Sequence, residues 1–410
     1  MGPAEPGDGS QRGMRDLLVS SPAFLRLALA LLISSIGDPL TLTVSLVILY
    51  TDTGMAAAVG AAYACRMLAA IVVGGLGGTI TDRVDRRRLM IWLDVLRFFL
   101  VATMPFTTRG SPLIVYAYLL VLGGAEALVQ PARLAAITTV VPERHIESAN
   151  SLVVTAFSIA QAAGFALAGV VLATLSDARL AFWGDAVTFG LSALFVITLP
   201  NLGGGVRTAV LRGGALGLLR RPSLRALLLV AGGANLLIGV GTPVILPIAY
   251  ELWRSGAVAY TWLEVALIAG LVLGSLVAPR IPVGRTLQAL AGALVLFALA
   301  AFGVGFTPVL AGGVFAIFWT GVGNAVYAVT NRSALMRRAE PTEQGTVMAA
   351  RYTLGQAAQI LGLGGGALSA TIIGPRATFI ATGAGLLAVA VAFSVQTARE
   401  TRQMTHRPDT

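Results

Sequence analysis

Long apolar stretches recur along this chain and restrict what it can fold into. Runs such as residues 27–44 carry apolar side chains on every face, and 56% of the 410 residues are hydrophobic while 12% are charged. One soluble core cannot bury so many apolar residues, whereas a bilayer takes about 20 helical residues per crossing. Outer-membrane barrels need strict alternation of lipid-facing and lumen-facing residues, which these runs lack. The sequence therefore predicts an all-α membrane protein.

The spacing of the apolar runs predicts twelve transmembrane helices, arranged as two six-helix halves. We expect a cytoplasmic tail at 1–22 without a signal peptide, an N-terminal half at 23–199, a cytoplasmic linker at 200–224, a C-terminal half at 225–397 and a cytoplasmic tail at 398–410. The predicted spans are 27–50, 56–80, 89–106, 113–131, 152–175, 180–199, 225–248, 257–277, 287–306, 309–329, 347–373 and 378–395.

Arginine supplies all 29 basic residues, because the chain contains no lysine. With the N-terminus inside, twenty-two arginines fall on the cytoplasmic side and four on the other, which fits the positive-inside rule. The net charge of +10 then reflects topology and anionic lipid, and not nucleic acid. Without lysine, a nucleotide-binding P-loop and Schiff-base chemistry are excluded. We expect no enzyme activity and no cofactor.

Two landmarks repeat between the halves at a constant spacing. Arg133 and Arg332 lie 199 residues apart, as do Pro142 and Pro341, each pair following the fourth helix of its half. Such a parallel duplication predicts a substrate site between the halves near the membrane midplane, with transport by rocking one half against the other.

The turn between the second and third predicted helices carries the most specific motif. It runs from Gly74 to Arg88 and contains Gly78, Asp82-Arg83 and Arg86-Arg87. This order of glycine, Asp-Arg and a later Arg pair resembles the signature of the major facilitator superfamily. The resemblance implies that Asp82 faces the start of the eleventh helix, where the helix dipole favours an anion, and latches one transport state. Arg351 is a second possible partner of Asp82.

Further segments resemble the drug/proton antiporter branch with its siderophore and macrolide exporters. They include Ser34 to Asp38 in the first helix and Gln130 to Arg133 in the fourth. This resemblance implies export with proton exchange. Drug antiporters usually carry a Gly-Pro pair in the fifth helix, where this chain has Gly164-Phe165.

Ionisable residues inside the predicted spans are candidates for function, because burying each charge in hydrocarbon costs about 3 kcal/mol. Asp38 and Arg66 lie at similar depth and could neutralise each other, as a proton site or as a static pair. Glu126 lies among small residues and could couple transport or bond to a neighbouring helix. Asp94 and Arg97, three residues apart, could pair on one helix face.

Further polar residues of the predicted spans are also candidates for function. Asp185, one turn into the sixth helix, could be functional or solvated, and Glu264 is the lone mid-span acid of the second half. Asn235, Asn324, Gln356 and Gln359 are uncharged groups at cavity depth. The two histidines lie in predicted cytosolic segments, so we expect no metal centre.

Together these features predict a secondary active transporter of the inner membrane with both termini in the cytoplasm. We expect it to export a small, largely apolar compound, such as a drug, antibiotic or secondary metabolite, by proton antiport. A lipid flippase or a small-solute uptake carrier of the same fold is the alternative. The expected partners are the substrate, protons and membrane lipids, and we expect a monomer.

Overall fold

The computed structural model describes residues 21–81, 84–109, 111–142, 145–203, 218, 221–340 and 343–405. The described residues form helices joined by short turns and include no strand. The chain divides into two compact units. The first comprises Met1–Ile48 and Cys65–Ala209, and the second comprises Leu49–Ala64 and Val210–Thr410.

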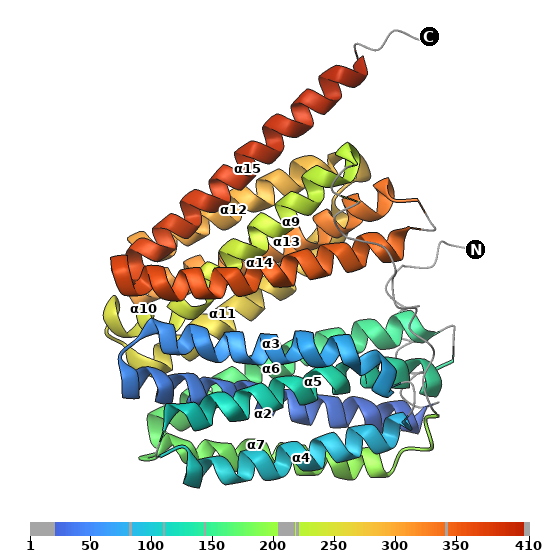
Figure 1. Cartoon of the computed structure of the whole chain (residues 1–410), viewed down its shortest axis with the longest axis vertical. Helices are drawn as coiled ribbons and strands as arrows, with labels where there is room; N and C mark the ends of the chain where they lie inside the picture. The colour runs from blue at the N-terminus through green and yellow to red at the C-terminus, as the bar shows by residue number, and fades with distance from the viewer. Residues whose placement is uncertain are drawn as a thin grey trace, which may run out of the picture. The chain divides into compact units, whose positions relative to one another are not determined.

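Six long helices make up most of the first unit, together with one short 3-10 turn (Figure 1). Among them α4 and α7 lie side by side, as do α4 and α5. Their bounds are α2 Pro22–Thr53, α3 Ala56–Thr81, α4 Arg86–Thr107, α5 Pro112–Val140, α6 Ile146–Thr174, η2 Ala178–Leu180 and α7 Ala181–Ile197.

The helices of the second unit are similar in length, and its first span is interrupted by a 3-10 turn that contains Pro243. Within this unit α11 and α12 pack against α13, α14 packs against α9, and α15 packs against α12. The bounds are α9 Pro222–Gly241, η3 Thr242–Val244, α10 Ile245–Glu251, α11 Gly256–Val277, η4 Ala278–Arg280, η5 Val283–Arg285, α12 Thr286–Phe306, α13 Leu310–Arg338, α14 Gln344–Ile373 and α15 Pro375–Thr405.

Twelve helical segments of the described chain are long and apolar enough to cross a membrane, which confirms the predicted number. The predicted ends are less accurate, most clearly in α5. We predicted that this helix ends at Pro131, but it continues for more than two turns to Val140, with Pro131 in its interior. Proline is tolerated inside membrane helices because neighbouring groups can satisfy the freed backbone carbonyl.

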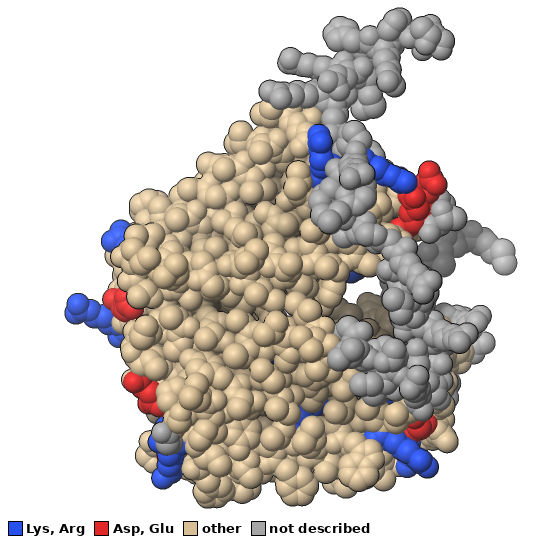
Figure 2. All heavy atoms as spheres, in the orientation of Figure 1, with Lys and Arg blue, Asp and Glu red and all other residues tan. Residues whose placement is uncertain are grey.

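Large apolar side chains point outward from the helices, as the surface of a lipid-exposed protein requires. Examples are Trp92, Leu361 and Ile372, each about 70% exposed. On the face shown in Figure 2, the described charged side chains lie mainly at the ends of the helices, and the surface between them is largely uncharged. This distribution matches a hydrocarbon belt flanked by two polar interfaces.

Close contacts between helix backbones hold each unit together. In the first unit a side chain at Gly164 of α6 would collide with the carbonyl of Ile36 in α2. In the second unit a side chain at Gly270 of α11 would collide with the carbonyl of Phe318 in α13. Small residues at such positions let membrane helices approach closely, where packing supplies the association energy that water cannot. The missing proline after Gly164 therefore coincides with a tight α2–α6 contact.

Candidate functional site

A fully buried ionic cluster joins α4 and α5 in the first unit. Arg97 donates to Asp94 at 2.7 Å, and both side chains are 1% exposed. This confirms the predicted pairing. Two partners were not predicted: Ser192 of α7 donates to the other Asp94 oxygen at 2.7 Å, and the Arg133 guanidinium lies 3.8 Å from Asp94. Arg133 also donates to Ser34 of α2 at 2.9 Å, so the cluster ties four helices together.

The burial of Arg133 was not predicted from the sequence. We assigned Arg133 to a cytoplasmic junction, but it lies within α5 and is 4% exposed. The sequence does contain an indication of this burial, because the residues after Arg133 stay largely apolar as far as Val141. A charged residue flanked on both sides by apolar sequence fits a buried helical position better than a loop.

A second ion pair links α3 to α5. Arg66 donates to Glu126, and the two side chains are 20% and 27% exposed. Gly123, one turn before Glu126, packs directly on the backbone of Arg66 and brings the two helices together. Among the described residues Arg66 thus forms an ion pair with Glu126, on another helix. The predicted neutralisation of Arg66 by Asp38 stays a prediction.

Asp38 lies in the middle of α2 and is partly accessible. It takes part in none of the ion pairs within 4.0 Å that the described residues form. Pro39 follows it and leaves one turn of the α2 backbone without an N–H donor. Its charged neighbours are Glu126, Arg66, Arg97 and Arg133.

The burial of Asp185 in α7 differs from one of the two possibilities that the sequence left open. We considered that it could be solvated, but its side chain is fully buried. Thr188 donates to Asp185 Oδ1 at 3.0 Å, and Gly37 of α2 packs against the same carboxylate. The position of a residue along a helix indicates its depth, but not which face of the helix carries it.

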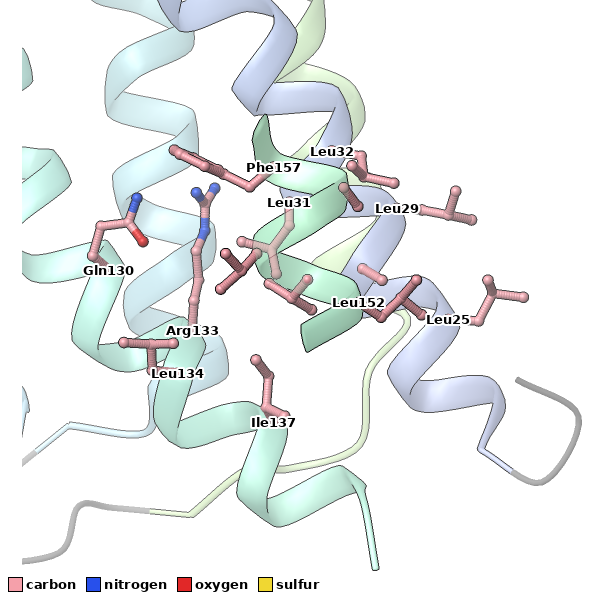
Figure 3. Close-up of a pocket in the computed structure, with 14 residues that line it drawn as sticks. Leu25, Leu29, Leu31, Leu32, Gln130, Arg133, Leu134, Ile137, Leu152 and Phe157 are labelled. Atoms are coloured by element: carbon pink, nitrogen blue, oxygen red, sulfur yellow. The ribbon is translucent and has the colours of Figure 1, made fainter. Parts of the chain in front are cut away.

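An apolar cavity of about 420 Å³ lies between α2, α5 and α6 in the first unit (Figure 3). Its volume falls within the range of about 300–1,000 Å³ that is typical of small-molecule sites. The side chains of Gln130, Arg133 and Phe157 gather at one side of it, and leucines and other aliphatic side chains form the rest. Its lining residues are Leu25, Ala28, Leu29, Leu31, Leu32, Gln130, Arg133, Leu134, Ile137, Leu152, Val153, Val154, Ala156 and Phe157.

The second unit contains a smaller polar cavity of about 90 Å³ between α9, α13 and α14. It brings together four of the predicted polar residues, namely Asn235, Asn324, Arg351 and Gln356. Gly355 allows this approach, because a side chain there would lie 3.2 Å from the Asn235 amide.

Arg351, predicted as a possible partner of Asp82, donates to Asn331 of α13 at 2.8 Å. Asn331 is fully buried and donates in turn to the carbonyl of Leu227 at 3.0 Å. Outside the spans, Arg221 bonds through both terminal nitrogens to Glu343, which raises the pKa of the Arg221 guanidinium above its ordinary value.

Glu264, the predicted mid-span acid of α11, is 8% exposed. Tyr260 lies one turn before it and forms a 3.1 Å hydrogen bond with Tyr63. Trp253, just before α11, is buried and donates to the carbonyl of Thr307 at 3.2 Å. Trp262 of α11 is 55% exposed. Among the described residues no group of three or more His, Cys, Asp or Glu side chains could hold a metal ion.

The predicted gating motif is described only in part. Asp82 and Arg83 lie outside the described residues, and Gly78 falls in the last turns of α3. Asp85 caps α4 by accepting from the Arg88 N–H at 2.9 Å. Arg86 is buried and donates to Thr139 of α5 at 3.3 Å. The latch by Asp82 therefore stays a prediction.

The twelve apolar helices of the described chain, with ionic groups buried among them, are those of a multi-pass membrane protein. The chain belongs to the Major Facilitator Superfamily, whose sequence model matches residues 27–363. This family consists of transporters and not of enzymes, in agreement with the prediction. The family and the twelve-helix fold that we predicted are thus confirmed.

Similarity to individual relatives is local in sequence and extensive in structure. The chain is 34% identical over 120 residues to a protein of Bacillus subtilis (strain 168) that is named "Putative bacilysin exporter BacE", covering 29% of this chain and 30% of that protein. It is 29% identical over 134 residues to the MFS-type transporter YfiS of the same strain, covering 33% and 31%. The chain thus matches less than a third of the length of these curated relatives.

Two solved structures share the fold at low sequence identity. A variant of the nucleoside transporter NupG superposes with a TM-score of 0.75 at 12% identity, covering 91% of this chain and 99% of that one. A variant of the peptide transporter POT superposes with a TM-score of 0.73 at 15% identity, covering 92% and 95%. At these identities the likeness concerns the fold alone.

Proposed function

We propose that the protein is a secondary active transporter that exports a small, largely apolar compound in exchange for protons. In this proposal it works in the inner membrane as a monomer, with both termini in the cytoplasm. Compounds of this class include drugs, antibiotics and secondary metabolites. The local similarity to a protein named as a bacilysin exporter supports the direction of transport.

The observation that carries this proposal is that Arg133 belongs to two features at once, the apolar cavity and the buried ionic cluster. Its side chain lines the apolar cavity, and its guanidinium belongs to the buried cluster with Asp94. A ligand that enters the cavity removes water next to Arg133 and so strengthens the electrostatic interactions around it. Substrate binding and the state of the ionisable groups are therefore linked through one side chain.

In the proposed cycle the protein alternates between an inward-facing and an outward-facing state, as other transporters built from repeats do. Asp38 binds a proton when the site faces outward, and releases it when the site faces the cytoplasm. Its partial accessibility and the absence of a described ion pair leave it able to exchange protons. Substrate occupies the cavity in the inward-facing state and leaves in the outward-facing state.

Transport by purified protein in proteoliposomes tests the proposal. With the neutral lipophilic dye Nile red as probe, a proton gradient should drive dye movement, and Asp38→Asn should abolish it while expression stays normal. Asp52→Asn is the matched control, because Asp52 is exposed at the end of the same helix. Proton-driven transport that survives in Asp38→Asn would contradict the assignment.

The same vesicles separate export from the two alternatives. A flippase of the same fold would move fluorescent phospholipids between leaflets without a proton gradient. An uptake carrier would show counterflow of a polar solute such as a nucleoside. Either result in the absence of proton-driven dye transport would replace the proposed function.

A further inference from the structure

Asp185 is a buried acid near Asp38 that has no part in the proposed transport cycle. Asp185 is fully buried in α7, and none of the ion pairs in the described part of the chain includes it. An ionised carboxylate in a dry interior is costly unless it is paired, so such a group tends to bind a proton instead. The burial of the Asp185 carboxylate without a direct ion pair therefore needs a physical explanation.

Several buried polar atoms in this region lack hydrogen-bond partners among the described residues. They are Asp185 Oδ2, the Thr41 hydroxyl of α2, and Nε and Nη1 of Arg97 in α4. Thr41 and Arg97 both face Asp185 from their own helices. The Arg97 guanidinium also lies 4.6 Å from the ring centre of Phe189, one turn beyond Asp185. Unsatisfied polar groups are rare in native interiors, and several in one region point to an exchangeable occupant.

The packing places Asp185 next to the proposed proton site. Gly37 has no side chain, and any Cβ there would collide with Asp185 Oδ1 and with the Thr188 hydroxyl. Gly37 directly precedes Asp38, and the Asp38 and Asp185 carboxylates are near enough to interact electrostatically. Asp38 is partly accessible whereas Asp185 is not, so a proton from water reaches Asp38 first.

We propose that Asp185 is a second proton-binding carboxylate of the transport cycle, loaded through Asp38 across the α2–α7 contact. The inference rests on the proposed proton antiport. In the loaded state an O–H bond forms at Asp185 Oδ2 and donates to the Thr41 hydroxyl. In the unloaded state the carboxylate accepts from Thr188 and Thr41, and faces Arg97.

Charged groups on two neighbouring helices act on Asp185 in opposite directions. An ionised Asp38 on α2 repels a second negative charge nearby. Arg97 on α4 attracts the Asp185 carboxylate, although its direct partner is Asp94 at 2.7 Å. In this proposal the charge of Asp38 therefore influences whether Asp185 holds a proton.

Proton release on substrate binding tests this inference. Nile red is added to the purified full-length protein in weakly buffered detergent, and the protons released per dye bound are counted with a pH indicator. Asp185→Asn should release one proton fewer than the wild type, Asp38→Asn should also release fewer, and the double variant should release none. Asp52→Asn should match the wild type.

The outcomes separate the inference from the function on which it rests. If the wild type releases no protons when dye binds, the proton antiport itself fails. If the wild type releases protons and Asp185→Asn releases the same number, Asp185 is a structural residue and the inference is overturned. Release of sodium in place of protons by the wild type would also overturn it.

A second measurement covers the case in which Asp185→Asn does not fold. A protonated carboxyl and a carboxylate absorb at different infrared frequencies, so pH difference spectra report buried acids directly. In folded Asp38→Asn a titrating carboxyl signal should remain, and Thr41→Val should shift that signal because it removes the proposed acceptor. If no titrating carboxyl signal remains in Asp38→Asn, Asp185 does not bind the exchangeable proton.

Discussion

The guanidinium of Arg133 lies 3.8 Å from the carboxylate of Asp94, while the same side chain lines the apolar cavity of the first unit. Asp94 already has a closer partner in Arg97 at 2.7 Å. Arg133 therefore makes the longer of the two ion-pair contacts of Asp94. This relationship places one charge at the boundary between the cavity and the buried acids.

Replacing Arg133 by methionine should uncouple transport without unfolding the protein. Breaking a buried ion pair by removing one residue typically destabilises a protein by about 3–5 kcal/mol, because the remaining charge has no partner. Asp94 keeps Arg97 and Ser192 as partners, so the loss of stability should be smaller here. Proton-driven dye transport should fall at least about tenfold, which corresponds to about 1.4 kcal/mol. Arg109→Gln is the control, because its pair with Asp177 is largely exposed and should contribute at most about 1 kcal/mol.

The Arg66–Glu126 pair should behave as a unit. Glu126→Gln removes one charge and leaves the Arg66 guanidinium in the membrane without its counter-ion, so thermal stability and transport should both fall. Replacing both residues by methionine should restore much of the stability, because apolar residues often replace buried pairs at no cost. Transport should stay lost. A double variant less stable than Glu126→Gln would argue against this reading.

Filling the apolar cavity should weaken binding of apolar substrates selectively. Ala156 lines the cavity from α6, and Ala156→Phe occupies part of its volume of about 420 Å³. Dye affinity, measured by fluorescence titration, should drop at least about tenfold. Ala173→Phe on an exposed part of the same helix should leave affinity unchanged. Equal affinity in both variants would mean that the dye binds elsewhere.

The contact at Gly164 should tolerate no side chain. Gly164→Ala places a methyl group against the Ile36 carbonyl, which should cost about 1–3 kcal/mol as overpacking. Gly364→Ala in α14 is the control, because nothing lies within 4 Å of the added carbon and helix propensity should favour alanine by about 1 kcal/mol. Thermal unfolding of the two variants should therefore shift in opposite directions.

The latch that the family resemblance assigns to Asp82 makes a separate prediction. Asp82→Asn removes the charge that the helix dipole would hold, so the equilibrium between inward-facing and outward-facing states should shift. Cysteine crosslinking in pairs across the two sides of the membrane reports these populations. Unchanged populations would count against the latch and leave the transport proposals untouched.

The number of spans was predictable from sequence because the length of an apolar run alone decides whether a helix can cross a membrane. The pairing of Asp94 with Arg97 was predictable because both lie on one turn of one helix. The partner of Arg66 and the burial of Asp185 depend on which faces of different helices meet, and a single sequence does not contain that information. The end of α5 was wrong because Pro131 was taken as a stop, and this also hid Arg133.

The positions of the two membrane ion pairs along the chain also affect how its helices enter the bilayer during translation. Asp94 and Arg97 neutralise each other within α4, so this helix can enter the bilayer with its charges already matched. Arg66 and Glu126 sit on α3 and α5 and are separated by 60 residues. At the usual speed of translation, Glu126 follows Arg66 into the membrane after roughly 3–12 s. During that interval α3 depends on lipid headgroups, water or the insertion machinery to shelter its arginine.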